Sequence, residues 1–281
     1  MTEALVLGGG GVGGIAWITG LLAGLADTGQ DVTGADLLLG TSAGSTVAAQ
    51  VGSGLALEEL YARQVDPALQ AAEIMAEMDL EWFAAEIGAA TGAAASVPEL
   101  RRAVGRAALG ARTVPEVERR AVIESRLPSH AWPDRTLKVV AVDAESGEAR
   151  VFDKDSGVPL VDAVAASCAV PGVWPPVTIG GRRYVDGGVR SIANVDQAAG
   201  ADRVVVLVPL GTTEPFPSEQ PLERAVEELR ERGAEVVVVA PDEASRAAIG
   251  DNALDPATRR PAAEAGRAQG RRLSLPWSDR S

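Results

Sequence analysis

The sequence has little of the chemistry on which disulfides, histidine catalysis and most transition-metal sites depend. Its 281 residues contain one cysteine, Cys168, and one histidine, His130. A single cysteine excludes an internal disulfide, and we expect Cys168 to be a small buried side chain. Because histidine and cysteine ligands are so few, we expect neither a metal site nor a cofactor.

Basic residues and long apolar runs are also scarce. The chain has 26 Lys and Arg against 39 Asp and Glu, which gives a formal net charge of −13. This excess of negative charge argues against binding to nucleic acid and against tight electrostatic adsorption to an anionic membrane. We find no signal-peptide pattern and no apolar run of about 18 residues that could span a bilayer. The sequence therefore predicts a soluble, cytoplasmic protein, and any contact that it makes with lipid must be apolar or local.

Apolar residues and glycine are plentiful: 46% of the chain is hydrophobic, and 31 residues are glycine. A chain of this length and composition can bury a large core, so we expect one α/β domain over residues 1–281. An alanine-rich, helical insert is expected over about 55–127, and a C-terminal extension of strands and helices over about 200–281. Between them we expect strands over 137–142 and 148–152, a helix over 161–170 and a hairpin over 179–188. In the extension we expect strands over 204–208 and 236–239, a helix over 222–232, and helix breaks at Pro256 and Pro261.

A glycine-rich loop follows the first expected strand, residues 4–7, and leads directly into residues with helical spacing. In such a loop the backbone N–H groups and the helix N-terminus point at negative charge. Two charges fit. One is a dinucleotide pyrophosphate, since Gly9, Gly11 and Gly14 match the Rossmann pattern, and the other is the oxyanion of an acyl-transfer intermediate.

The nucleotide alternative is the weaker of the two. The Rossmann pattern expects an acidic residue that closes the second strand. Here Asp31 and Asp36 precede the second strand, residues 37–39, instead of following it.

The second strand runs into a Gly-x-Ser-x-Gly pattern formed by Gly40, Ser42 and Gly44. This pattern is typical of a nucleophile elbow, in which a strained turn between strand and helix exposes the serine hydroxyl. Ser42 is therefore the candidate nucleophile. If both strands are parallel, the glycine loop and Ser42 reach the same edge of the sheet.

A base for Ser42 is harder to find. His130 lies in a proline-bounded loop, and the histidine that an α/β-hydrolase carries near its C-terminus is missing here. The remaining candidate is Asp186, which a hairpin delivers to the glycine turn Gly187-Gly188. A free aspartate, with a pKa of about 3.9, is a weak base, so burial must raise its basicity and amides must stabilise the oxyanion. Such an apparatus suits ester substrates better than peptides.

Five apolar side chains of the insert suit an acyl-binding cleft or a lid, although ordinary packing between helices explains them more simply. They are Ile74, Met78, Trp82, Phe83 and Ile87. The arginine pairs 101–102 and 119–120 are expected on solvated helix faces.

Taken together, these motifs resemble those of patatin-like phospholipases. The resemblance rests on GGGVGGIAW (9–17), GTSAG (40–44), ASCAVPG (166–172) and RRYVDGG (182–188), and it extends over residues 5–199. It implies a three-layer α/β/α fold with a mainly parallel central sheet. It also implies a lipid acyl-ester hydrolase that cleaves phospholipids, lysophospholipids or acylglycerols.

The resemblance also implies roles for individual residues. Ser42 attacks the ester, Asp186 activates Ser42 without a histidine, and Gly10, Gly11 and Val12 supply the oxyanion amides. One departure is Gly13, where many relatives have arginine or lysine, so rate and substrate preference are open. A lipid-binding module that has lost turnover is a further alternative.

Overall fold

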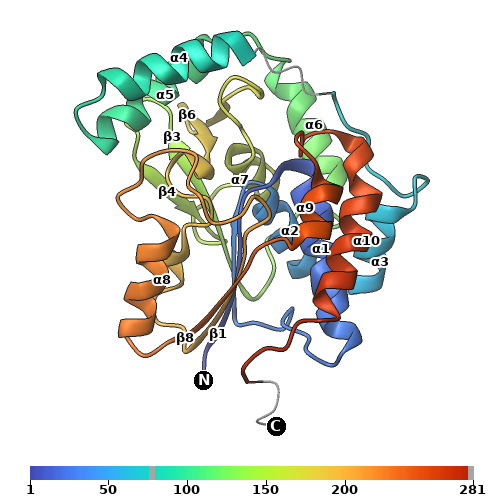
Figure 1. The fold of residues 1–281 in the computed structure, drawn as a ribbon. Helices are drawn as coiled ribbons and strands as arrows, with labels where there is room; N and C mark the ends of the chain where they lie inside the picture. Colours follow the sequence, from blue (N-terminus) through green and yellow to red (C-terminus); the bar gives the residue numbers. More distant parts are fainter. Residues whose placement is uncertain (76–79, 278–281) are drawn as a thin grey trace.

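The computed structural model describes residues 1–75 and 80–277. Its centre is an eight-stranded sheet (Figure 1). The strands are β1 (Glu3–Leu7), β2 (Leu37–Thr41), β3 (Thr136–Asp143), β4 (Ala149–Phe152), β5 (Val177–Ile179), β6 (Arg182–Asp186), β7 (Arg203–Leu207) and β8 (Glu235–Val239). Their order in the sheet is β5-β6-β3-β2-β1-β7-β8, and β4 pairs with β3 outside this path.

The sheet is mainly parallel. Strands β3, β2, β1, β7 and β8 pair in parallel, whereas β4, β5 and β6 add antiparallel pairs on the β3 side. In the central register Leu5 lies beside Leu38 of β2 and Val205 of β7. Because β1 and β2 are adjacent and parallel, the segments that follow them meet at one edge of the sheet. This is where the sequence predicts the glycine loop and Ser42.

Helices cover both faces of the sheet. They are α1 (Gly11–Asp27), α2 (Ala43–Gly52), α3 (Leu57–Val65), α4 (Leu80–Ala93), α5 (Val97–Gly110), α6 (Glu116–Arg126), α7 (Leu160–Ser167), α8 (Leu222–Glu231), α9 (Glu243–Ile249) and α10 (Arg259–Gly270). Three short 3-10 helices lie at Gly187–Val189, Val195–Ala198 and Pro256–Thr258. Figure 1 shows α1, α3, α9 and α10 grouped on one side of the strands and α8 on the other.

Alternating side chains of the strands separate two parts of the core. Leu5 and Leu7 of β1 point into the cluster that contains the apolar residues of α1. Ala4 and Val6 point the opposite way, into the cluster with Val226 of α8. Since successive residues of a strand face opposite sides of a sheet, both faces are buried. This confirms the three-layer α/β/α prediction.

Helix α10 lies directly against α1, backbone to backbone. A Cβ atom at Gly20 of α1 would lie 2.0 Å from the carbonyl oxygen of Ala263, and one at Gly266 of α10 would lie 2.4 Å from that of Trp17. Only glycine permits helices to approach so closely. The C-terminal extension is thereby fixed against the helix that begins at the glycine loop, and Arg259, the first residue of α10, is brought near the site.

Several expected elements differ in detail. Pro261 does not break a helix, because it lies in the first turn of α10, where its missing N–H has no intrahelical acceptor to lose. The helix expected over 161–170 ends at Ser167 instead. The chain turns there, and the carbonyl of Ala169 accepts the N–H of Asp186 at 3.0 Å.

The arginine pairs were also expected on solvated faces. This prediction is wrong for Arg119, and the side chain of Arg101 is only 11% exposed as well. The side chain of Arg119 is 7% exposed, while that of its neighbour Arg120 is 36% exposed. Arg119 is buried because its guanidinium stacks on the Trp174 ring, 3.6 Å from the ring centroid, and pairs with Glu73. In the described part of the chain, no helix combines the length and apolar character needed to cross a membrane.

Candidate active site

Ser42 forms the corner between β2 and α2, and its backbone is strained. With φ 53° and ψ −121° it is one of two non-glycine residues with positive φ among those the structure describes. Such a conformation costs on the order of 1–3 kcal/mol and persists only when the surroundings impose it. Ser42 remains 7% exposed, so the corner is nearly enclosed.

The glycines on either side of Ser42 allow this corner to form. A Cβ atom at Gly40 would lie 2.3 Å from Cα of Ser45, and one at Gly44 would lie 1.9 Å from the carbonyl oxygen of Leu7. Both distances are far below van der Waals contact. The N–H of Gly44 donates to the carbonyl of Gly8 at 3.1 Å. The elbow is therefore packed against the end of β1 and the glycine loop.

Three side chains hold the peptide groups of Ser42. Its N–H donates to Oγ of Ser167 at 2.9 Å, and that hydroxyl donates to the carbonyl of Val140 at 2.6 Å. The carbonyl of Ser42 accepts from Oγ of Ser45 at 2.7 Å and from Sγ of Cys168 at 3.2 Å. Cys168 is buried as expected, and burial raises the pKa of its thiol. These contacts fix the position of the serine from both sides.

The glycine loop presents free backbone amides. The N–H groups of Gly9, Gly13 and Gly14 are taken by carbonyls at 2.7 to 2.9 Å. In the part of the chain that the structure describes, the N–H groups of Gly10, Gly11 and Val12 have no hydrogen-bond acceptor, as is normal where a helix begins. A helix N-terminus with free amides attracts negative charge.

Asp186 ends β6, opposite Ala141 of β3, and is 5% exposed. Its Oδ1 accepts the N–H of Gly188 at 2.7 Å. Its Oδ2 is buried and has no hydrogen-bond partner within the described residues. The turn after Asp186 needs glycine, since a Cβ atom at Gly187 would lie 2.3 Å from the carbonyl oxygen of Val140.

Burial dominates the protonation of Asp186. It raises the pKa of this carboxyl to about 6, although the nearby Ser42 hydroxyl and the Gly188 N–H lower it in part. A carboxylate in a low-dielectric environment holds a proton more tightly than one in water. Asp186 is thus a stronger base than an ordinary aspartate and is still ionised at neutral pH.

A cavity of about 310 Å³ joins these groups. Ser42, Asp186, Gly188 and residues 9–11 border it, and the rest of its lining is apolar. The apolar residues are Val170, Pro171, Val189, Ile192, Leu210, Pro215, Phe216, Ala253 and Leu254. Val12 instead borders a small separate cavity of about 20 Å³ that also touches Ser42. Deep, mainly apolar cavities with a few convergent polar groups are typical of small-molecule sites.

The sequence predicts that residues of the helical insert line an acyl-binding cleft, but the described lining of this cavity comes from other segments. Its apolar residues come from the segments that follow α7, β6, β7 and α9, and none of the described lining residues belongs to the insert. The expected cleft residues Met78, Trp82, Phe83 and Ile87 lie outside the residues whose side chains the structure describes, and the half-buried Ile74 does not border this cavity.

The described contacts of His130 are with Glu124, not with Ser42 or Asp186. Its ring contacts Glu124, with Nε2 3.2 Å from the carbonyl oxygen and Nδ1 3.6 Å from a carboxylate oxygen. It is exposed and does not border the cavity that contains Ser42. Among the described residues we find no group of three or more His, Cys, Asp or Glu side chains placed to hold a metal ion.

The sequence alone assigns no role to Asn194, but its side chain holds several segments of the site together by hydrogen bonds. It is fully buried, has φ 51°, and donates from Nδ2 to Thr41 Oγ1 at 3.0 Å and to the carbonyls of Ser191 and Gly187 at 2.9 and 3.3 Å. An asparagine shortly after a glycine turn is a weak signal, because asparagine is common in turns.

Comparison with known proteins identifies the family of this chain. Residues 5–199, more than half of the chain, match the family model described as patatin-like phospholipase. Two similar solved structures are VipD from Legionella pneumophila (13% identity, TM-score 0.48) and the type III effector protein ExoU (14% identity, TM-score 0.37). Alignments cover 96% and 97% of this chain, which spans 66% and 54% of those two proteins. On the strength of the family match, this chain belongs to the patatin-like phospholipase family.

Proposed function

We propose that this protein hydrolyses fatty-acyl esters of lipids, with Ser42 as the nucleophile and Asp186 as its base. The observation that supports this most strongly is the shared cavity. Ser42, the buried Asp186 carboxylate and the free amides of Gly10 and Gly11 all border one space whose remaining lining is apolar. An acyl chain fits such a lining, while an ester carbonyl needs the polar groups at its end.

The reaction proceeds in two halves. Ser42 Oγ attacks the ester carbonyl carbon as its proton passes to Oδ2 of Asp186, the carboxylate oxygen without a partner. Negative charge develops on the carbonyl oxygen, and the amides of Gly10, Gly11 and Val12 stabilise it. The tetrahedral intermediate then expels the alcohol, which takes the proton from Asp186. Water attacks the acyl-serine with Asp186 again as base, and this step releases the fatty acid and restores Ser42.

The cavity mouth suggests how lipid arrives. Leu210 borders the cavity and is 60% exposed, and the partly buried Phe216 also borders it. Exposed apolar groups at the rim of a cavity favour transient contact with a membrane or micelle. This contact is apolar and local, which suits a chain with a net charge of −13.

The test is a hydrolysis screen over phospholipids, lysophospholipids and acylglycerols with purified protein. We expect fatty-acid release by the wild type and a loss of at least about 10³-fold in kcat for Ser42→Ala. Ser129→Ala, a serine in the loop near His130, is the control and keeps full activity. Lipid that is bound but not hydrolysed by the wild type would indicate a non-catalytic lipid-binding protein. Saturable NAD(P) binding that is insensitive to Ser42 substitution would indicate the nucleotide alternative.

A further inference from the structure

Three buried arginines converge on one glutamate beside the candidate active site. Arg119 and Arg126 come from α6, and Arg259 begins α10. Each of their side chains is 7% exposed, and the side chain of Glu73 is 2% exposed. Glu73 pairs with Arg119 at 2.6 Å, with Arg126 at closer range and with Arg259 at 3.7 Å. We call these four residues the arginine cluster.

The arginine cluster has an excess of positive charge. Within the described residues, Glu73 is the only acidic side chain that pairs with any of its three arginines. Burial lowers the pKa of Arg119 and of Arg126 to about 10, which still leaves both protonated at neutral pH. Buried charges are normally paired, because an unpaired ion in a low-dielectric interior is strongly unfavourable. One carboxylate facing three guanidinium groups therefore leaves the cluster under-neutralised.

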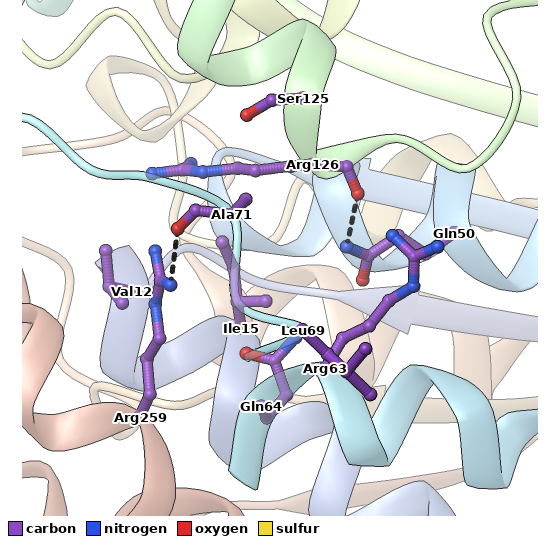
Figure 2. A pocket seen from close by; sticks show the side chains of 10 residues that line it. All are labelled: Val12, Ile15, Gln50, Arg63, Gln64, Leu69, Ala71, Ser125, Arg126 and Arg259. Carbon is purple, nitrogen blue, oxygen red and sulfur yellow. Dashed lines mark hydrogen bonds between the residues drawn. The ribbon is translucent and has the colours of Figure 1, made fainter. Parts of the chain in front are cut away.

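Hydrogen bonding in the cluster is incomplete as well. Arg259 donates to the carbonyl of Ala71 at 2.7 Å, and Figure 2 shows the Arg126 and Arg259 side chains converging on the chain at Ala71. Nε of Arg119 is buried and has no acceptor among the described residues. In a cluster with an excess of positive charge, this N–H is free to donate to a further anion.

The position of the cluster links it to Ser42. Arg119 and Arg126 border the same small cavity of about 20 Å³ as Ser42 and Val12. Arg126 and Arg259 border a second cavity of similar size, shown in Figure 2. The large apolar cavity has none of these arginines in its lining. Ser42 therefore borders the large apolar cavity and also a small cavity whose lining includes Arg119 and Arg126.

We propose that Arg119, Arg126 and Arg259 bind the phosphate group of a lipid substrate, and that Glu73 occupies their site until the phosphate replaces it. This inference rests on the proposed function. In a phosphoglyceride the ester and the phosphate are separated by only a few bonds. A serine that attacks the ester while the chain lies in the apolar cavity thus needs a phosphate site close on another side.

Replacement of the Glu73 carboxylate by a phosphate explains why a carboxylate lies among the three arginines. The two small cavities that the arginines border have volumes of only about 20 Å³ each and cannot hold a phosphate, so the carboxylate must leave when the phosphate enters. Glu73 belongs to a stretch, residues 71–75, that is neither helix nor strand. Guanidinium forks match phosphate oxygens in paired hydrogen bonds, and a phosphate has more acceptor atoms than a carboxylate. The protein accordingly favours phosphate-bearing lipids over neutral acylglycerols.

The first experiment compares two substrates with the same acyl chain, lysophosphatidylglycerol and monoacylglycerol. The measured quantity is kcat/KM for lysophosphatidylglycerol divided by kcat/KM for monoacylglycerol. For Arg126→Gln and Arg259→Gln we expect this ratio to fall by about 10- to 100-fold relative to wild type. Arg120→Gln, which changes a half-exposed arginine of the same helix, keeps the wild-type ratio. An unchanged ratio in the cluster variants, with Ser42 still essential, overturns the phosphate site. Hydrolysis that survives Ser42→Ala overturns the proposed function instead.

A second experiment covers variants that fold poorly. Glu73→Gln leaves three buried cations without a counter-charge, so we expect a lower Tm in chloride. Inorganic phosphate at matched ionic strength should then raise the Tm of Glu73→Gln more than that of wild type. Glu58→Gln, which removes an exposed partner of Arg267, is the control and should respond as wild type does. An equal rise in Tm with phosphate in all three proteins means that Glu73 only stabilises the fold and does not occupy a phosphate site. A phosphate response without the substrate-ratio change means that the site does not serve lipid.

Discussion

Asn194 donates a hydrogen bond to Thr41, the residue before Ser42, and another to the carbonyl of Gly187, the residue after Asp186. One buried amide thus joins the two segments that carry the proposed nucleophile and base. Its third bond, to the carbonyl of Ser191, fixes the amide itself. The spacing of Ser42 and Asp186 therefore depends on Asn194 as well as on the sheet.

Asn194→Ala is expected to reduce kcat by about 10- to 100-fold with a smaller change in KM, because misplacement of reacting groups by a fraction of an ångström slows the chemical step. Loss of its buried hydrogen bonds should also lower the free energy of unfolding by about 1–3 kcal/mol. Steady-state kinetics and denaturant unfolding measure both. Asn194→Gly removes the same amide without strain at φ 51°, so it should lose as much kcat but less stability. Full kcat in a destabilised Asn194→Ala protein would assign Asn194 a purely structural role.

The pH dependence of hydrolysis follows from the protonation of Asp186. A pKa of about 6 means that the carboxylate is the main form above pH 6 and is lost below it. We expect kcat/KM on an uncharged ester to be constant from pH 7 to 8 and to fall by about tenfold per pH unit below 6. A stopped-flow or pH-stat profile checks this. An inflection near pH 4, the ordinary range for aspartate, would contradict the role of burial.

Asp186→Asn should trade activity for stability. The folded state raises the pKa of Asp186 from its ordinary value of about 3.9 to about 6, so folding becomes less favourable as pH rises through this window. Above pH 6 the penalty reaches about 3 kcal/mol, and below about pH 4 it vanishes. The variant should therefore have almost no turnover yet a higher Tm than wild type at pH 7.5, and no such advantage at pH 4. Thermal unfolding at both pH values measures the difference.

Gly44→Ala tests the packing of the elbow against β1. The added methyl would lie 1.9 Å from the carbonyl oxygen of Leu7, so the chain must shift or fail to fold. We expect a loss of about 3 kcal/mol or more in the free energy of unfolding. Gly34→Ala adds a methyl where no heavy atom lies within 4 Å, and it should be neutral. Equal stability of the two variants would mean that the elbow is not held against β1 as described.

Local patterns were sufficient to predict the sheet, the glycine loop and the elbow. Short continuous apolar runs and glycines at fixed spacing report backbone geometry within a few residues. The strands, the glycine loop with Gly10 and the elbow with Ser42 could be predicted from them alone. Burial of Arg119 could not be predicted, because it depends on Glu73, 46 residues away, and on Trp174. The role of Asn194 could not be predicted for the same reason, because its acceptor Thr41 is 153 residues away in the sequence.

The lining of the apolar cavity was equally hidden from local patterns. Leu210, Phe216 and Leu254 belong to irregular segments between elements, which have no periodicity to read. They meet only because β7, β8 and α10 pack where they do. The helical insert was predicted to supply such residues because it contains apolar side chains such as Trp82 and Phe83. Apolar character alone does not say where a helix lies.

Covalent labelling by a fluorophosphonate tests the central claim, that Ser42 is a nucleophile activated by Asp186, more directly than any turnover assay. Intact-protein and peptide mass spectrometry would locate the adduct and give its rate in wild type, Ser42→Ala, Asp186→Asn and His130→Ala. We expect one adduct, on Ser42, in wild type and at the same rate in His130→Ala, at least about 100-fold slower labelling in Asp186→Asn, and none in Ser42→Ala. An adduct on another residue, or a His130→Ala protein as slow as Asp186→Asn, would contradict the account.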